Sequence, residues 1–177
     1  LAIYHSLGKA GINFQARIVG GGPLRDALKT ECNRLGLGDK VLFLGPLAED
    51  EAFELYTETD LFFFTGKVAS NGDRDGLPNV IPEAMSAGVV VITSSTGGAA
   101  EALDEGNTGF VRDPQNPSEW VELIEHLLAS PDQVIDLRKE AVKAARRLFD
   151  VNRTARELST CLLEASRQCV TYPKSVS

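Results

Sequence analysis

Two carboxylates, Asp75 and Glu83, flank a glycine–proline turn within residues 72–85. Asn79 is a residue type that often caps a helix N-terminus through its side-chain oxygen, and Pro82 falls where the third residue of such a helix would be. A helix that begins there turns free backbone amides, and the positive end of its dipole, toward the preceding loop. We therefore expect an anion site suited to phosphate, with a carboxylate on either side of it.

The carboxylates themselves suit a neutral ligand with hydroxyl groups. An ionised carboxylate only accepts hydrogen bonds, so each acid can bind two hydroxyl donors of a ribose or a hexose. Diphosphate on the amides and sugar hydroxyls on Asp75 and Glu83 together outline a nucleotide-sugar site. The alternative is an Asp- and Gly-rich loop before a capped helix that binds nothing, as most such loops do.

The same stretch resembles the donor-binding signature of retaining glycosyltransferases of family 4, which have the two-domain GT-B fold. It has an acidic residue, seven intervening residues and a glutamate, with glycine after the first acid and Glu-Ala-Met at the end. Further segments, within a match over residues 1–167, resemble motifs of that family in the family's order. They are IVGGGPL at 18–24, VLFLG at 41–45, AGVVVIT at 87–93, GGAAE at 97–101 and GNTGFV at 106–111.

The resemblance implies a role for each residue of the loop. The donor-binding residues would be Asp75, Gly76, Leu77, Pro78, Asn79 and Glu83. Glu83 would bind the two ribose hydroxyls, and Asp75 the hydroxyls of the transferred sugar. Asp75 would also be catalytic, stabilising the transition state without attacking as a nucleophile. The family usually has glutamate at position 75, so the shorter aspartate indicates a subfamily whose donor sugar can differ.

Composition and charge restrict the partners and cofactors. The formal net charge of −7 argues against nucleic acid, which requires a basic surface. The three cysteines and two histidines have no metal-like spacing, which favours free thiols in a reducing compartment. The resemblance likewise implies no metal and no other cofactor, the substrate being a nucleotide-diphosphate sugar. We expect a cytoplasmic protein, with contact at the membrane periphery through an acceptor-binding domain outside this chain.

Short apolar runs alternate with helical patterns along the 177 residues. This alternation indicates an α/β fold, a Rossmann-like parallel sheet with helices on both faces. The continuous apolar runs predict strands that are buried on both sides. Strands are expected at residues 14–19, 41–44, 61–64, 89–93 and 109–111. Helices are expected at 24–35, 51–57, 79–87, 98–103, 118–129, 133–149 and 153–169. We expect one domain over residues 1–170 and a frayed tail over residues 171–177.

The first residues have helical spacing at Leu1, Tyr4 and Leu7, with no strand before them. In the family, a strand and a basic loop that binds the diphosphate precede this helix, and an acceptor-binding domain precedes both. The chain therefore looks like the C-terminal, donor-binding half of a GT-B enzyme, and alone it should not transfer sugar. The helix at 153–169, capped by Asp150 or Asn152, would in the family reach back across the cleft between the domains.

The glycines at 20–22 allow two interpretations. The favoured one is a tight turn from strand to helix, because Arg25 stands where a dinucleotide fingerprint requires glycine. The other is direct contact with the ligand through the backbone of Gly20, Gly21 and, after the next strand, Gly45.

Together these features predict the donor domain of a retaining hexosyltransferase that acts on a glycan, a lipid or a small molecule. Two alternatives stay open: an enzyme on the same scaffold that resembles a nucleotide-sugar epimerase, and a non-catalytic Rossmann-like module that binds a nucleotide. Nucleotide-sugar binding that depends on both Asp75 and Glu83 would separate these interpretations.

Overall fold

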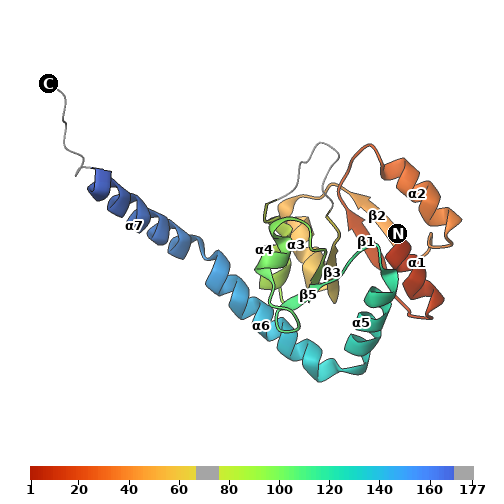
Figure 1. The fold of residues 1–177 in the computed structure, drawn as a ribbon. Helices are drawn as coiled ribbons and strands as arrows, with labels where there is room; N and C mark the ends of the chain where they lie inside the picture. Colours follow the sequence, from red (N-terminus) through yellow and green to blue (C-terminus); the bar gives the residue numbers. More distant parts are fainter. Residues whose placement is uncertain (67–75, 170–177) are drawn as a thin grey trace.

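A computed structural model describes residues 1–66 and 76–169 of the chain (Figure 1). The helices are α1 (Ala2–Lys9), α2 (Arg25–Arg34), α3 (Glu49–Thr57), α4 (Val80–Ser86), the 3₁₀ helix η1 (Gly97–Ala102), α5 (Pro117–Ala129), α6 (Pro131–Phe149) and α7 (Val151–Cys169). The strands are β1 (Ala16–Val19), β2 (Val41–Gly45), β3 (Leu61–Phe64), β4 (Val90–Thr93) and β5 (Gly109–Val111). The predicted alternation of strands and helices is confirmed, and only the segment at 98–103 differs in type, because it forms a 3₁₀ helix.

All strand pairs are parallel, as predicted, but the strands form two hydrogen-bonded sheets and not one. β1 pairs with β2, while β3, β4 and β5 form a second sheet in that order. In a doubly wound sheet whose strands are numbered along the chain, the spatial order is 3-2-1-4-5-6, so strand 1 lies between strands 2 and 4. β1 and β3 correspond to these separated strands, and no strand within residues 1–66 and 76–169 joins them. The predicted α/β class with parallel strands is confirmed, and within the described residues these strands are hydrogen-bonded in two separate groups.

The three-stranded sheet is covered on both faces, as the sequence predicts. On one face, Phe62 and Phe64 pack with buried residues of α3, α4 and α6. On the other face, Leu61 and Phe63 pack with buried residues of α1 and α5. The stripe of α5 that faces this second core contains Trp120, Leu123, Ile124 and Leu127, all buried. Every residue of β4 is buried, so this strand forms the centre of the fold.

The two-stranded sheet is covered on one face only, which corrects the prediction of burial on both sides. Ala16 and Val41 pack against Cys32 of α2 and Leu37. The alternate side chains are exposed: Val19 by 47%, Leu42 by 45% and Leu44 by 39%. Apolar composition alone does not reveal whether a second layer is present on the other side of a strand.

The last two helices differ in their packing. α6 buries one face, with Leu137, Ala141, Ala144 and Ala145, whereas α7 extends away from the sheets (Figure 1). Asp150 caps α7, because its Oδ1 accepts hydrogen bonds from the amides of Asn152 at 2.8 Å and Arg153 at 3.0 Å. The exposed large apolar residues of α7 include Val151 (75%), Leu158 (58%), Leu162 (62%) and Leu163 (57%). Among the described residues, no helix has the length and apolar character needed to cross a membrane.

Candidate functional site

The loop before α4 is tied to the connection between β4 and η1. The amide of Gly98 donates to the carbonyl of Gly76 at 2.7 Å, and the hydroxyl of Ser94 donates to the carbonyl of Gly66 at 3.0 Å. A Cβ at position 98 would lie 2.7 Å from the Gly76 carbonyl oxygen, so only glycine fits there without a shift of the loop. Gly66 and Gly76 are the described residues on either side of segment 67–75. The predicted catalytic residue Asp75 lies in that segment, outside the described residues.

The start of α4 differs from the prediction in one respect. Asn79 occupies the N-cap position, but its side chain makes no capping hydrogen bond. Its backbone is already helical, with φ −57° and ψ −30°, whereas a capping side chain requires an extended backbone at that residue. The amide of Ile81 instead donates to the carbonyl of Pro78 at 3.0 Å, so a backbone turn replaces the side-chain cap. Pro82 is the third residue of α4, as predicted.

The loop before α4 presents backbone amides that have no partner within the described residues. Within the part of the chain that the structure describes, the amides of Leu77, Asn79 and Val80 donate to no other group. Gly76 and Leu77 are exposed, so these donors lie at the surface near the C-terminal ends of β3 and β4. Free amides of this kind suit an anionic ligand oxygen.

Glu83 projects from the first turn of α4 and is half-buried. Its Oε2 lies 3.4 Å from the hydroxyl of Tyr56 on α3, which also lies 3.5 Å from the carbonyl oxygen of Val80. Burial raises the pKa of Tyr56 to about 12, and the charge of Glu83 and this hydrogen bond raise it in the same direction. Tyr56 therefore keeps its proton at neutral pH and acts as the donor.

Sequence reasoning missed Tyr56. No spacing rule connects residue 56 with residue 83, because the contact is made by the tertiary packing of α3 against α4. A tyrosine in the last turn of a helix, as Tyr56 is in α3, carries no such signal on its own, and only the fold reveals the pair.

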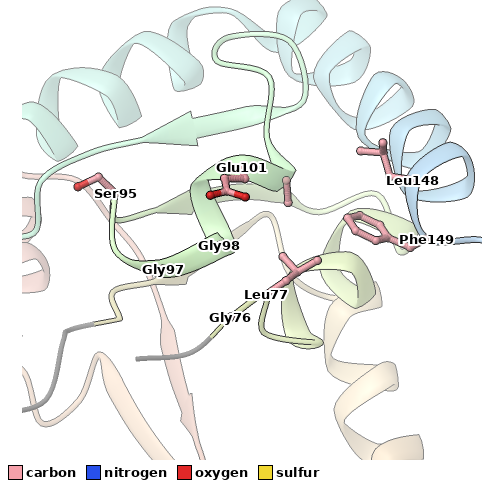
Figure 2. Close-up of a pocket in the computed structure, with 9 residues that line it drawn as sticks. Gly76, Leu77, Ser95, Gly97, Gly98, Glu101, Leu148 and Phe149 are labelled. Atoms are coloured by element: carbon pink, nitrogen blue, oxygen red, sulfur yellow. The ribbon is translucent and has the colours of Figure 1, made fainter. Parts of the chain in front are cut away.

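A hollow of about 660 Å³ lies beside the loop (Figure 2). Its lining residues are Gly76, Leu77, Ser95, Gly97, Gly98, Glu101, Ala102, Leu148 and Phe149. Ser95 lies at one end, Leu148 and Phe149 lie at the other, and the carboxylate of Glu101 lies between them (Figure 2). Of the predicted donor-binding residues that the structure describes, Gly76 and Leu77 line this hollow, and Pro78, Asn79 and Glu83 do not. Glu101 belongs to the GGAAE motif, to which the sequence analysis assigned no role.

The glycine turn before α2 is joined to the end of β2 by a backbone hydrogen bond. The amide of Gly20 donates to the carbonyl of Gly45 at 2.8 Å, and both residues have positive φ, +120° and +82°. A Cβ at Gly21 would make only an ordinary contact, 3.4 Å from the ring of Pro46. These facts favour the tight-turn interpretation, and contact with a ligand through Gly20, Gly21 or Gly45 stays a prediction.

The described residues offer no ready metal ligands. Among residues 1–66 and 76–169, no group of three His, Cys, Asp or Glu side chains is placed to hold a metal ion. Cys32 and Cys161 are free thiols, the first buried and the second exposed. Burial raises the pKa of the Cys32 thiol, as expected for a packing residue.

Comparison with known proteins gives consistent matches. The family described as glycosyl transferases group 1 matches residues 1–148. A GDP-mannose-dependent alpha-(1-6)-phosphatidylinositol monomannoside mannosyltransferase of Mycobacterium tuberculosis is 34% identical over 119 residues, which are 67% of this chain and 31% of that protein. A D-inositol 3-phosphate glycosyltransferase of Corynebacterium efficiens is 30% identical over 154 residues, 84% of this chain and 35% of that protein.

Solved structures agree with the sequence matches. The Anabaena protein HepE, in complex with UDP-glucose, superposes with a TM-score of 0.72 and 27% identity, over 85% of this chain and 41% of that one. The sucrose-phosphate synthase of Thermosynechococcus elongatus has a TM-score of 0.77 at 20% identity, which shows the shared fold. The chain thus spans about a third of the length of the curated relatives that it matches.

Proposed function

This chain belongs to the glycosyl transferases of group 1, and from that premise we propose that it binds the nucleotide-diphosphate sugar donor of a retaining hexosyltransferase. The observation that carries the proposal is the pairing of two features at one edge of the fold. The amides of Leu77, Asn79 and Val80, which have no partner among the described residues, can bind anionic oxygen, and the half-buried carboxylate of Glu83 can bind hydroxyl groups.

Each part of the donor then has a place. The diphosphate accepts hydrogen bonds from the amides of the 76–80 loop, and the two ribose hydroxyls donate to Glu83. Asp75 binds hydroxyls of the transferred sugar. The relatives named above use different donors, since one is GDP-mannose-dependent and HepE was solved with UDP-glucose, so their names support the donor class and not one base.

The reaction follows from this arrangement. The bond between the anomeric carbon and the diphosphate oxygen breaks, and the leaving diphosphate takes both electrons of that bond. The acceptor hydroxyl attacks the anomeric carbon from the same face, and its proton passes to the leaving phosphate oxygen. Amides that donate to the diphosphate stabilise the charge that develops on it, without a metal or another cofactor. Asp75 stabilises the positive charge of the sugar in the transition state.

The acceptor belongs to a partner domain outside this chain. Transfer requires the acceptor to be aligned with the donor and water to be excluded, and such positioning contributes roughly 7–11 kcal/mol to lowering the barrier. We propose that the complete enzyme contains a second domain that supplies the acceptor. The share of each relative's length that this chain covers supports this division.

The test is a melting-temperature screen of the chain against UDP-, GDP- and ADP-sugars and the matching free nucleoside diphosphates. A ligand that binds the folded state raises the melting temperature, by mass action. We expect one nucleotide series to stabilise the chain. Asp75→Ala should then reduce the shift given by the nucleotide sugar more than the shift given by the free nucleotide. The absence of any shift at millimolar ligand would contradict the proposal, and equal losses for both ligands would remove Asp75 from the sugar subsite.

A further inference from the structure

We propose that Tyr56 is a positioning residue for Glu83: its hydroxyl holds Oε2 of the carboxylate, so that the remaining acceptor positions are fixed toward the ribose. This inference rests on the proposed binding of ribose by Glu83. It adds a residue from α3 that no motif of the loop includes.

The contact joins two helices at one point. The hydroxyl of Tyr56 lies 3.4 Å from Glu83 Oε2 and 3.5 Å from the carbonyl oxygen of Val80, and both acceptors belong to the first turn of α4. A phenol has one hydrogen to donate, so these two acceptors share it. Both distances are longer than is usual for an O–H···O hydrogen bond, so each contact is a weak one.

The ring of Tyr56 is fixed by the core. Its residue is only 8% exposed, and its ring packs edge-on against Phe53 and Phe62, with centroids 6.3 Å and 5.8 Å away. The hydroxyl is therefore held in place by aromatic packing. Glu83, in contrast, has three side-chain torsions, whose freedom is lost when a ligand binds. A fixed donor at Oε2 removes part of that cost before the ligand arrives.

A carboxylate can share its oxygens in this way. It offers about four acceptor positions, and Tyr56 takes one of them. Since burial raises the pKa of Tyr56 to about 12, its hydroxyl remains a donor at neutral pH. The remaining positions of Glu83 are enough for two ribose hydroxyls.

Tyr4 provides a matched control. It is also an inward-facing tyrosine whose pKa burial raises to about 12. Its ring stacks on Phe14 and Phe63, with centroids 5.7 Å and 5.8 Å away. Phe62 and Phe63 are neighbours on β3 and point to opposite faces, so Tyr56 and Tyr4 lie on opposite sides of the same strand.

The experiment measures how each variant discriminates a ribonucleotide from its 2′-deoxy analogue. UDP, GDP and ADP, each beside its 2′-deoxy counterpart, are titrated calorimetrically into the wild-type chain, Tyr56→Phe, Glu83→Gln and Tyr4→Phe. We expect the wild type to prefer the ribonucleotide and Glu83→Gln to lose most of that preference. Tyr56→Phe should reduce the preference about threefold to tenfold, the effect of a modest hydrogen bond. Tyr4→Phe should leave it unchanged.

The outcomes separate this inference from the function on which it rests. Equal losses of affinity for the ribonucleotide and the deoxynucleotide in Tyr56→Phe would show a purely structural role and overturn the inference. An unchanged preference in Tyr56→Phe, with the preference lost in Glu83→Gln, would also overturn it while keeping Glu83 as the ribose ligand. An unchanged preference in Glu83→Gln, or no binding of any nucleotide, would overturn the proposed function.

The double variant Tyr56→Phe/Glu83→Gln completes the test. If Tyr56 acts through Glu83, the tyrosine substitution has no further effect on the preference once Glu83 is changed. Independent, additive effects of the two substitutions would contradict the inference.

Discussion

In each of the two sheets, the first strand is followed by a helix, α2 after β1 and α4 after β3. The residues just before these two helices are supported differently. Before α4, the loop at Gly76 is tied to Gly98, and the helix buries Ile81, Ala84 and Met85 completely. Before α2, the glycine turn is joined to the end of β2, because the amide of Gly20 donates to the carbonyl of Gly45. The helix α2 itself buries only Cys32. The first turn belongs to a sheet with two covered faces, and the second to a sheet with one.

This difference teaches where a precise binding geometry can be built. A loop that is anchored on a close-packed core keeps its amides in fixed positions, because a close-packed interior has low compressibility and resists displacement of the loop. Within residues 1–66 and 76–169, the amides of Leu77, Asn79 and Val80 donate to no other group, whereas the Gly20 amide already donates to Gly45. This contrast supports the proposal that the first turn binds the ligand, while contact with a ligand through the second turn stays a prediction.

The largest expected effect is on stability and comes from the helix under the supported turn. Met85→Ala should lower the free energy of unfolding by about 2–5 kcal/mol, because the side chain is completely buried and its loss leaves a cavity. Leu24→Ala at the N-cap of α2 should change it by less than about 0.5 kcal/mol, since Leu24 is 67% exposed. Urea unfolding of both variants measures the contrast, and similar costs would erase the distinction between the two turns.

The next effect concerns the glycines that shape the two turns. In Gly98→Ala, the new Cβ would meet the Gly76 carbonyl oxygen at 2.7 Å, so the loop must shift. A backbone shift of this kind costs about 1–3 kcal/mol, and nucleotide affinity should fall by about tenfold. Gly21→Ala is the matched control, because its Cβ makes only an ordinary contact with Pro46. Titration with the nucleotide found in the melting screen compares the two, and a larger loss in Gly21→Ala would move the ligand to the glycine turn.

The smallest effect distinguishes two helix starts. Asp150→Ala removes hydrogen bonds to the amides of Asn152 and Arg153 and should destabilise the start of α7 by about 1 kcal/mol. Asn79→Ala removes no capping bond, so α4 should be affected by no more than a few tenths of a kcal/mol. Amide hydrogen exchange at the first turns of α4 and α7 reads each helix separately. If Asn79→Ala raised the exchange rate in α4, relative to the wild type, by more than Asp150→Ala raises it in α7, Asn79 would be shown to cap its helix.

Much of the fold could be predicted because periodicity records burial. In the sequence, Trp120, Leu123, Ile124 and Leu127 recur at helical spacing, which predicts a core-facing stripe, and the structure buries all four residues. The same logic failed at Leu42 and Leu44, because an apolar strand looks alike whether one or both of its faces are covered. Whether both faces of a strand are buried depends on which elements pack against it, and the sequence of the strand alone does not show this.

The candidate site was predicted only as far as local sequence reaches. Glu83 and the loop from Gly76 to Asn79 adjoin in the chain, so one motif contains them. The contact of Tyr56 with Glu83 and the bond from Gly98 to Gly76 join residues that are far apart in sequence, and they require the fold. The side-chain cap at Asn79 was wrong because residue type indicates a tendency to cap, whereas the backbone of the preceding turn decides the outcome.

The central claim is that Glu83 binds the ribose of a nucleotide, and one titration tests it most directly. The nucleoside diphosphate that stabilises the chain is titrated calorimetrically into the wild type and Glu83→Ala, with the melting temperature of each as a check on folding. Charge-assisted hydrogen bonds are worth about 1.5–3 kcal/mol, so we expect the affinity to fall by about ten- to a hundredfold in a folded variant. Equal affinities in the two proteins would contradict the account and remove Glu83 from the site.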